Sequence, residues 1–165
     1  MLPKSILFLA TLGPIGNKCL APGTFGSLAG LIVIVILLIW SSLSLFQIGL
    51  LFIPLILLGI PICTHAEKIT GQSDPGEIIW DEFTSFPLVF LGLPDSISTD
   101  NITEMIVWLL LGFILFRLFD IFKPLGIKKI QHVGQGLGVM IDDVLAALYG
   151  AIILNLAFTF SLSFF

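Results

Sequence analysis

The sequence predicts an all-α fold, a polytopic membrane helix bundle of four to five spans with an acidic site at the cytoplasmic helix ends. Of the 165 residues, 57% are hydrophobic and only 11% are charged, and the mean hydropathy is +1.13. Soluble domains carry about 25% charged residues, so this composition indicates a membrane protein. The length allows one domain over residues 1–165, because each span needs roughly 20 apolar residues. The net charge of −4, without a block of Lys or Arg, argues against nucleic-acid binding.

Four apolar runs predict spans. The first occupies residues 28–40, the second extends from about residue 45 to residue 63, and the sequence "MIVWLLLGFILFRLFDIF" at 105–122 forms another. The last span begins near residue 137 and extends towards residue 165, which exceeds one bilayer thickness and indicates a helix that tilts or protrudes. The short apolar run at the N-terminus lacks an A-x-A-like cleavage site, so we expect it to stay in the mature protein.

One further apolar segment, "IIWDEFTSFPLVFLGL" at residues 78–93, is short for a span. Gly71, Pro75 and Gly76 predict a loop near residues 68–77 ahead of it. Both a crossing and a re-entrant path are compatible with its length, and the choice affects the orientation of the whole chain.

The positions of the cations predict that orientation, because short cytoplasmic loops carry an excess of Lys and Arg. The loops at 41–45 and 94–104 contain neither residue and are expected to face out. If residues 78–93 cross, alternating spans place all lysines on the cytoplasmic side: Lys4, Lys18, Lys68, Lys123, Lys128 and Lys129. A re-entrant segment would break this alternation.

Charged side chains within the apolar runs are the candidate functional residues. A charge near the centre of a lipid-facing helix costs about 2.5–3.5 kcal/mol, so such groups usually face a protein interior or a water-filled site. The predicted threading brings six of them to the cytoplasmic ends of three helices: Asp81, Glu82, Arg117, Asp120, Asp142 and Asp143.

The spacing of these residues predicts how they point. Arg117 and Asp120 lie three residues apart and share a helix face. The adjacent acids in "WDEF" and "IDDV" diverge by about 100°, so we expect one member of each pair to face the centre and the other to lie at its edge. Converging carboxylates without a nearby cysteine or histidine pair favour Mg²⁺ over Zn²⁺.

A second candidate element is "APGTFGSLAG" at residues 21–30, directly before the first span. Pro22 and Gly23 predict a turn and Thr24 can cap the following helix, whose free N–H groups would attract an anion. The alternative is a capped helix whose small residues serve packing alone.

Two other classes of protein stay open on these residues. Intramembrane acids also mark the pathways of cation transporters and channels, although such sites are expected near the midplane and often between repeated halves. A non-catalytic membrane subunit would use Arg117 and Asp120 as an internal ion pair and the remaining acids as helix-start residues favoured by the helix dipole.

Four ordered blocks resemble the phosphatidylglycerophosphatase A family over nearly the whole chain: "APGTFGS" (21–27), "IIWDEF" (78–83), "FRLFDIFKP" (116–124) and "GLGVMIDDVLA" (136–146). The resemblance implies a Mg²⁺-dependent phosphomonoesterase in the bacterial inner membrane that releases inorganic phosphate from phosphatidylglycerophosphate at the cytoplasmic face and leaves phosphatidylglycerol. It singles out as catalytic residues Asp81, Glu82, Arg117, Asp120, Lys123, Asp142 and Asp143.

Roles follow from the side-chain chemistry within this resemblance. Asp81 is expected to orient or deprotonate water. The expected ligands of one or two Mg²⁺ ions are Glu82, Asp120, Asp142 and Asp143. The expected phosphate-binding residues are Thr24, Gly26, Ser27, Arg117 and Lys123.

Overall fold

The computed structural model describes residues 2–41, 43–94, 97, 101–124, 126–127 and 134–162. Within these ranges the chain forms helices joined by turns, and the predicted all-α fold is confirmed. Four of the helices are long and apolar enough to cross a membrane: α3, α4, α6 and α8. The elements in chain order are α1 (Leu2–Ala10), α2 (Ile15–Lys18), α3 (Pro22–Trp40), α4 (Leu45–Thr70), α5 (Trp80–Ser85), the 3₁₀ helix η1 (Phe86–Phe90), α6 (Ile102–Phe122) and α8 (Gly136–Leu162).

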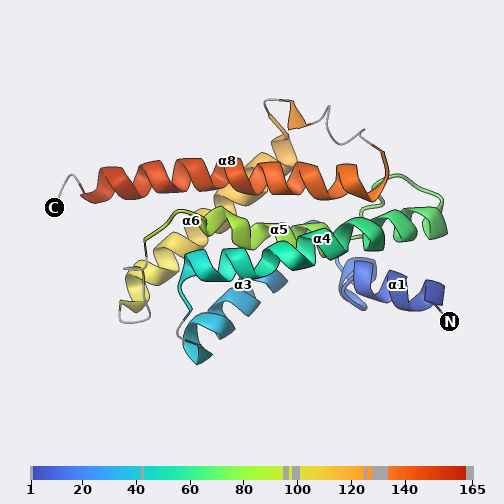
Figure 1. Ribbon diagram of the computed structural model, residues 1–165, viewed down its shortest axis with the longest axis horizontal. Helices are drawn as coiled ribbons and strands as arrows, with labels where there is room; N and C mark the ends of the chain where they lie inside the picture. Colours follow the sequence, from blue (N-terminus) through green and yellow to red (C-terminus); the bar gives the residue numbers. More distant parts are fainter. Residues whose placement is uncertain are drawn as a thin grey trace.

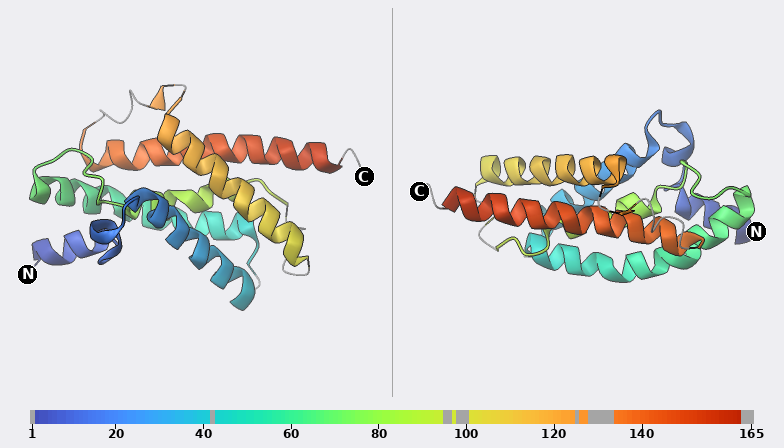
Figure 2. Two further views of the ribbon diagram at one scale, coloured as in Figure 1. Left: turned by 180° about the vertical axis from the view of Figure 1, so that it is seen from behind. Right: turned by 90° about the horizontal axis from the view of Figure 1, so that it is seen from above.

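The four long helices surround the short α5–η1 segment. Helices α4 and α8 run side by side in opposite directions, while α3 and α6 are inclined to them (Figure 1). The two further views show α3 and α6 on one side of the bundle (Figure 2). Helix α5 packs against α3, α4 and α8, and η1 packs against all four long helices.

The α5–η1 segment is the central element of the hydrophobic core. Its six-residue α-helix and five-residue 3₁₀ helix together measure about 19 Å, which is less than the roughly 30 Å of hydrocarbon in a bilayer. Phe86, Val89 and Phe90 are completely buried. The mainly apolar composition of residues 78–93 therefore reflects burial of most of the segment within the protein.

The short segment nevertheless keeps the alternation of the chain. From the C-terminal end of α4 the chain passes through α5 to the opposite end of the bundle, where α6 begins (Figure 1). Lys18 and Lys68 lie in the last turns of α2 and α4, and Lys123 is the C-cap of α6. Lys128 and Lys129, which the sequence assigned to the same side, lie outside the described residues.

Two helices begin or end beyond the predicted limits. Helix α3 starts with Pro22 in its first turn and Ala21 as N-cap, so the prediction that Thr24 caps it is wrong. Proline fits the first helical turn because that turn needs no N–H donor. Helix α4 continues to Thr70 rather than ending near residue 63, and the loop begins only at Gly71, whose φ of 70° is the left-handed conformation that glycine adopts easily at a helix end.

Close contact between backbones sets α5 against α3. A Cβ atom added to Gly26 would stand 3.0 Å from the carbonyl oxygen of Ile79, and one added to Gly30 would stand 2.9 Å from that of Phe83. On the other side, the Trp80 indole N–H donates to the carbonyl oxygen of Leu55 in α4 over 3.2 Å. These contacts hold the first turn of α5 in one position and so place its acidic residues.

Candidate active site at the helix ends

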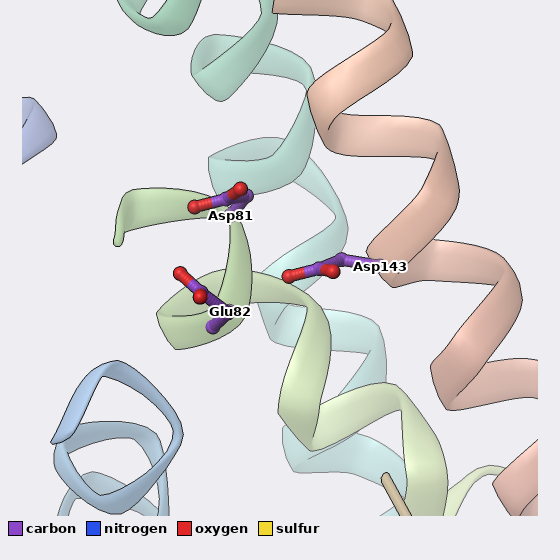
Figure 3. A group of neighbouring side chains, drawn as sticks. All are labelled: Asp81, Glu82 and Asp143. Carbon is purple, nitrogen blue, oxygen red and sulfur yellow. The ribbon is translucent and has the colours of Figure 1, made fainter. Parts of the chain in front are cut away.

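Three carboxylates from two helices converge beside the start of α5. Asp81 and Glu82 lie in its first turn and Asp143 lies near the beginning of α8. One oxygen from each side chain lies within 4.8 Å of the others. Figure 3 shows Asp81 and Glu82 on α5 and the Asp143 side chain extending from α8 towards them.

The prediction that only one of two adjacent acids faces the centre is wrong for Asp81 and Glu82. The space that Glu82 needs comes from α3, where two glycines stand opposite it. A Cβ atom added to Gly23 would stand 2.1 Å from Glu82 Oε1, and one added to Gly26 would stand 3.3 Å from Glu82 Cβ. Glu82 can therefore bend back towards Asp81, despite the angle between them on the helix.

The converging carboxylates retain unused oxygen atoms. Asp81 Oδ1, Glu82 Oε2 and Asp143 Oδ2 are buried and have no hydrogen-bond partner within the described ranges. Burial, followed by the charge of Glu82, raises the pKa of Asp81 well above its ordinary value, and burial with the charge of Asp143 does the same for the pKa of Glu82. Buried anions are costly unless a cation or protons offset them, so this oxygen-only group is chemically suited to a hard divalent cation.

Arg117 connects two of the surrounding elements. Its Nη1 lies 2.6 Å from Asp120 Oδ2, one turn further along α6, and donates to Ser27 Oγ of α3 over 3.3 Å. The predicted shared face of Arg117 and Asp120 is thus confirmed. Arg117 Nε is buried without a partner among the residues that the structure describes. This guanidinium keeps one donor available beside the three carboxylates.

Lys123 forms a second ion pair, with Asp142 of α8. Burial acts to lower the pKa of Lys123, but its hydrogen bond to Asp142 and the surrounding negative charges outweigh that effect and raise it. The other Asp142 oxygen, Oδ1, accepts the backbone N–H of Asp143 over 3.1 Å. Asp142 therefore points towards α6 while Asp143 points towards α5, as the divergence of neighbouring helical residues predicts.

The glycine-rich segment before the first span contributes mainly packing and one polar contact. Gly26 and Ser27 are buried, and the Ser27 hydroxyl donates to the Gly23 carbonyl oxygen over 3.0 Å while accepting from Arg117. Thr24 is partly exposed in the first turn of α3. Of the three predicted phosphate-binding residues in this segment, Ser27 contacts the charged site through its hydrogen bond with Arg117.

The sequence model of the phosphatidylglycerophosphatase A family matches residues 8–158. The chain belongs to the phosphatidylglycerophosphatase A family. This membership identifies it as an enzyme of the phosphatase class, and it gives no support to a transporter or a non-catalytic subunit.

Individual relatives cover most of the chain. A phosphatidylglycerophosphatase A of Haemophilus influenzae is 44% identical over 135 residues, which are 81% of this chain and 76% of the relative. The phosphatidylglycerophosphatase A of Escherichia coli is 34% identical over 84% of this chain and 75% of its own length. A protein of Bacteroides thetaiotaomicron named "Putative phosphatidylinositol-3-phosphatase" is 33% identical over 86% of both chains.

The bacterial relatives and the four apolar helices together indicate a multi-pass membrane protein of bacteria. No solved structure is significantly similar to the chain.

The structure groups the acids of this family member differently from the ligand set expected from its sequence, Glu82, Asp120, Asp142 and Asp143. Asp81 stands in the converging group with Glu82 and Asp143. Asp120 and Asp142 instead pair with Arg117 and Lys123, because each has a basic side chain within contact distance. Only the folded arrangement shows which carboxylates have such partners.

Two acidic residues that the sequence analysis did not single out lie near this site. The negative charge of Asp74 contributes to the raised pKa of Asp81, after burial and the charge of Glu82. Glu67, in the last turns of α4, is 7% exposed and accepts the backbone N–H of Asp74 on its Oε1 over 2.8 Å. In the sequence, Glu67 lies near the end of a helix and Asp74 lies in a glycine-containing loop. Both positions are explained without a functional role, so no local pattern marks either residue as part of the site.

Proposed function

We propose that this family member is a Mg²⁺-dependent lipid phosphatase that converts phosphatidylglycerophosphate to phosphatidylglycerol and inorganic phosphate. The supporting observation is the group formed by Asp81, Glu82 and Asp143, which converge beside two cationic side chains and each keep one buried oxygen without a hydrogen-bond partner among the described residues. A phosphatase needs positive charge to bind its anionic substrate, and a purely acidic group would repel a phosphate unless it held a metal ion.

Asp81, Glu82 and Asp143 would hold the ion in this proposal. When bound, Mg²⁺ would polarise the phosphate group and offset the charge that develops on the leaving oxygen. Asp120 and Asp142, which the sequence also suggested as ligands, would act on the basic residues with which they pair.

The remaining side chains can position the reacting groups. Arg117, held by Asp120 and Ser27, would donate to the phosphate oxygens, and Lys123 would add a second positive charge. Asp81 would accept a proton from the attacking water, whose oxygen forms the new bond to phosphorus as the bond to the glycerol oxygen breaks. The glycerol oxygen then takes a proton from solvent.

We further propose that the site faces the cytoplasm from the bacterial inner membrane. Support comes from Lys18, Lys68 and Lys123, which end three helices on the site's side of the bundle. A variant with Cys19→Ser and Cys63→Ala and one new cysteine at exposed Leu20 would test this. A membrane-impermeant thiol reagent should label it only after spheroplasts are permeabilised, and labelling of intact spheroplasts would contradict the orientation.

The activity is tested by phosphate release from phosphatidylglycerophosphate in detergent micelles, with either Mg²⁺ or EDTA present. Asp143→Asn should lower kcat at least about 100-fold, since it removes one charged member of the group. Glu104→Gln is the matched control, because Glu104 lies in the first turn of α6 at the other end of the bundle. Release that is unaffected by EDTA or by Asp143→Asn would contradict the proposed site.

The Bacteroides relative makes the lipid headgroup a separate question. Phosphatidylglycerophosphate and phosphatidylinositol 3-phosphate should be compared at equal surface concentration in the same micelles. A higher kcat/KM for phosphatidylglycerophosphate is expected. A preference for the inositol lipid would support the phosphatase activity but contradict phosphatidylglycerophosphate as the proposed substrate.

A further inference from the structure

A buried hydroxyl lies one helical turn beyond Asp81 in α5. Ser85 is completely buried, and its Oγ has no hydrogen-bond partner among the residues that the structure describes. Buried polar atoms of folded proteins nearly always have a partner, which is either another protein group or an ordered water molecule. The Ser85 hydroxyl therefore needs a partner that the described side chains and backbone do not supply.

Other helical hydroxyls of this chain find their partner within their own helix. Donation to the carbonyl oxygen four residues earlier is made by Ser27, Thr64, Thr70, Thr84 and Thr159. For Ser85 that acceptor would be the carbonyl oxygen of Asp81, which instead lies 3.4 Å from the donating hydroxyl of Thr84. Ser85 thus differs from its buried neighbour, whose hydroxyl is occupied by the backbone.

Ser85 lies on the same face of α5 as Asp81. The two residues are four positions apart in one α-helix, so their Cβ atoms are about 5–6 Å apart. Asp81 Oδ1 is also buried and has no hydrogen-bond partner in the described part of the chain. Two polar groups that lack partners therefore lie one turn apart on one helix face.

The facing helix α8 has small side chains at the level of Ser85. Asp143 of α8 converges with Asp81. Further along both elements, a Cβ atom added to Gly150 would stand 2.7 Å from Val89 Cγ2. Ser85 is halfway between Asp81 and Val89 in the chain, so it lies between these two contacts. On the α8 side, the level between them contains two completely buried residues, Ala146 and Ala147.

The separation between Ser85 and Asp81 suits a single bridging water. Two successive hydrogen bonds of about 2.8 Å through one water can span the distance between side chains one turn apart. Buried waters occupy positions of this kind, where they bond to polar groups that otherwise lack partners. The alanines of α8 place no bulky side chain at this level.

We propose that Ser85 is a positioning residue, whose hydroxyl donates through one buried water to the Asp81 carboxylate and thereby orients Asp81 for cation binding. Hydrogen bonds to the groups that hold a metal ion fix their orientation and strengthen binding. The inference rests on the proposed function, since it assigns Ser85 a role towards the same ion. Ser85 itself is placed in contact with neither ion nor substrate.

Infrared spectroscopy of the full-length protein in EDTA tests the hydrogen-bonded link without any metal or catalysis. The band of the Asp81 carboxyl is the one that Asp81→Asn removes. It should shift in Ser85→Ala, which deletes only the hydroxyl. Thr84→Val is the matched control, because it removes the neighbouring buried hydroxyl that is bound to the backbone, and it should leave the band in place. An unshifted band in Ser85→Ala would overturn the proposed link.

Cation binding tests the consequence of this link. The dissociation constant for Mn²⁺, measured by its electron paramagnetic resonance signal, should rise about 10-fold in Ser85→Ala. Ser85→Cys keeps a weak donor and should show a smaller rise. Thr84→Val should bind Mn²⁺ like the parent protein. Parent-like affinity in Ser85→Ala, or an equal rise in Thr84→Val, would overturn the inference.

The two proposals fail in different ways. If the parent protein binds Mn²⁺ but hydrolyses no lipid phosphate, the phosphatase proposal fails while the role of Ser85 stands. If the parent hydrolyses phosphatidylglycerophosphate with Mg²⁺ and Ser85→Ala keeps both the Asp81 band and the Mn²⁺ affinity, the role of Ser85 fails while the phosphatase proposal stands.

Discussion

Gly23 of α3 lies against the carboxylate of Glu82 in α5, so closely that a Cβ atom on Gly23 would stand 2.1 Å from Glu82 Oε1. The same added atom would stand 3.3 Å from Arg117 Nη1. One glycine therefore leaves the space in which an acid and a base of the site approach each other. Gly23 of "APGTFGS" thus serves the site because it has no side chain.

Gly23→Ala should lower activity with little loss of stability. The atom that must move is the far end of a flexible side chain, so the protein can relieve the clash by displacing Glu82. We expect kcat to fall about 10- to 100-fold, as for a displaced catalytic group, while the thermal unfolding midpoint changes little. Ile32→Ala, on the exposed face of the same helix, is the control that should leave both unchanged.

Gly30→Ala provides the contrasting case. Its added Cβ atom would stand 2.9 Å from the backbone oxygen of Phe83, which cannot rotate away. We expect destabilisation of about 1–3 kcal/mol, as for other overpacked positions, measured by unfolding in denaturing detergent. Equal stability of Gly23→Ala and Gly30→Ala would contradict this distinction between side-chain and backbone neighbours.

Breaking the pair between Lys123 and Asp142 should cost more stability than removing it altogether. Lys123→Met leaves the Asp142 side chain, which is 2% exposed, without its partner and should cost about 3 kcal/mol. The double variant Lys123→Met/Asp142→Asn should recover at least half of that loss but remain inactive. A double variant that is no more stable than Lys123→Met would show that the pair is not the source of the loss.

Arg117→Lys should damage activity although the charge is kept. Lysine cannot contact Asp120 and Ser27 and still present a planar pair of donors to a phosphate. We expect kcat/KM for phosphatidylglycerophosphate to fall about 10- to 100-fold, the loss expected for a charged hydrogen bond. Ser27→Ala should lower it about fivefold, since it removes one neutral contact. Parent-like kinetics of Arg117→Lys would rule out a bidentate role.

The metal-free protein should lose stability as pH rises. Burial raises the pKa values of Asp81 and Glu82, helped by the charge of Glu82 at Asp81 and by the charge of Asp143 at Glu82, so the folded protein keeps protons that the unfolded chain releases above about pH 4. Because the folded state then binds more protons, the free energy of unfolding should fall from about pH 4 up through the raised pKa values. In EDTA, Asp81→Asn should flatten this fall, measured by thermal unfolding between pH 4 and 8. A parent protein whose stability in EDTA rises over that range would contradict it.

Much of the fold could be predicted because the apolar runs are long. Residues 105–122 and the last span end close to the observed limits of α6 and α8, since only a helix satisfies every backbone group of an apolar run in a bilayer. The end of α4 was predicted early because "THAEKIT" is polar, yet these residues form helix readily when Ala66 and Glu67 pack inward. Residues 78–93 could not be placed from their pattern, since burial within protein and exposure to lipid favour the same side chains.

The sequence by itself determined the class of protein, the family and the charged residues that gather at one end of the helices. Their partners were decided by the tertiary structure. Asp120 and Asp142 meet cations, whereas Asp81, Glu82 and Asp143 meet one another, because α5 packs against α8 and, through glycine contacts, closely against α3. Spacing along one helix predicts directions around that helix alone, and the distance between charges on different helices depends on how closely their backbones pack.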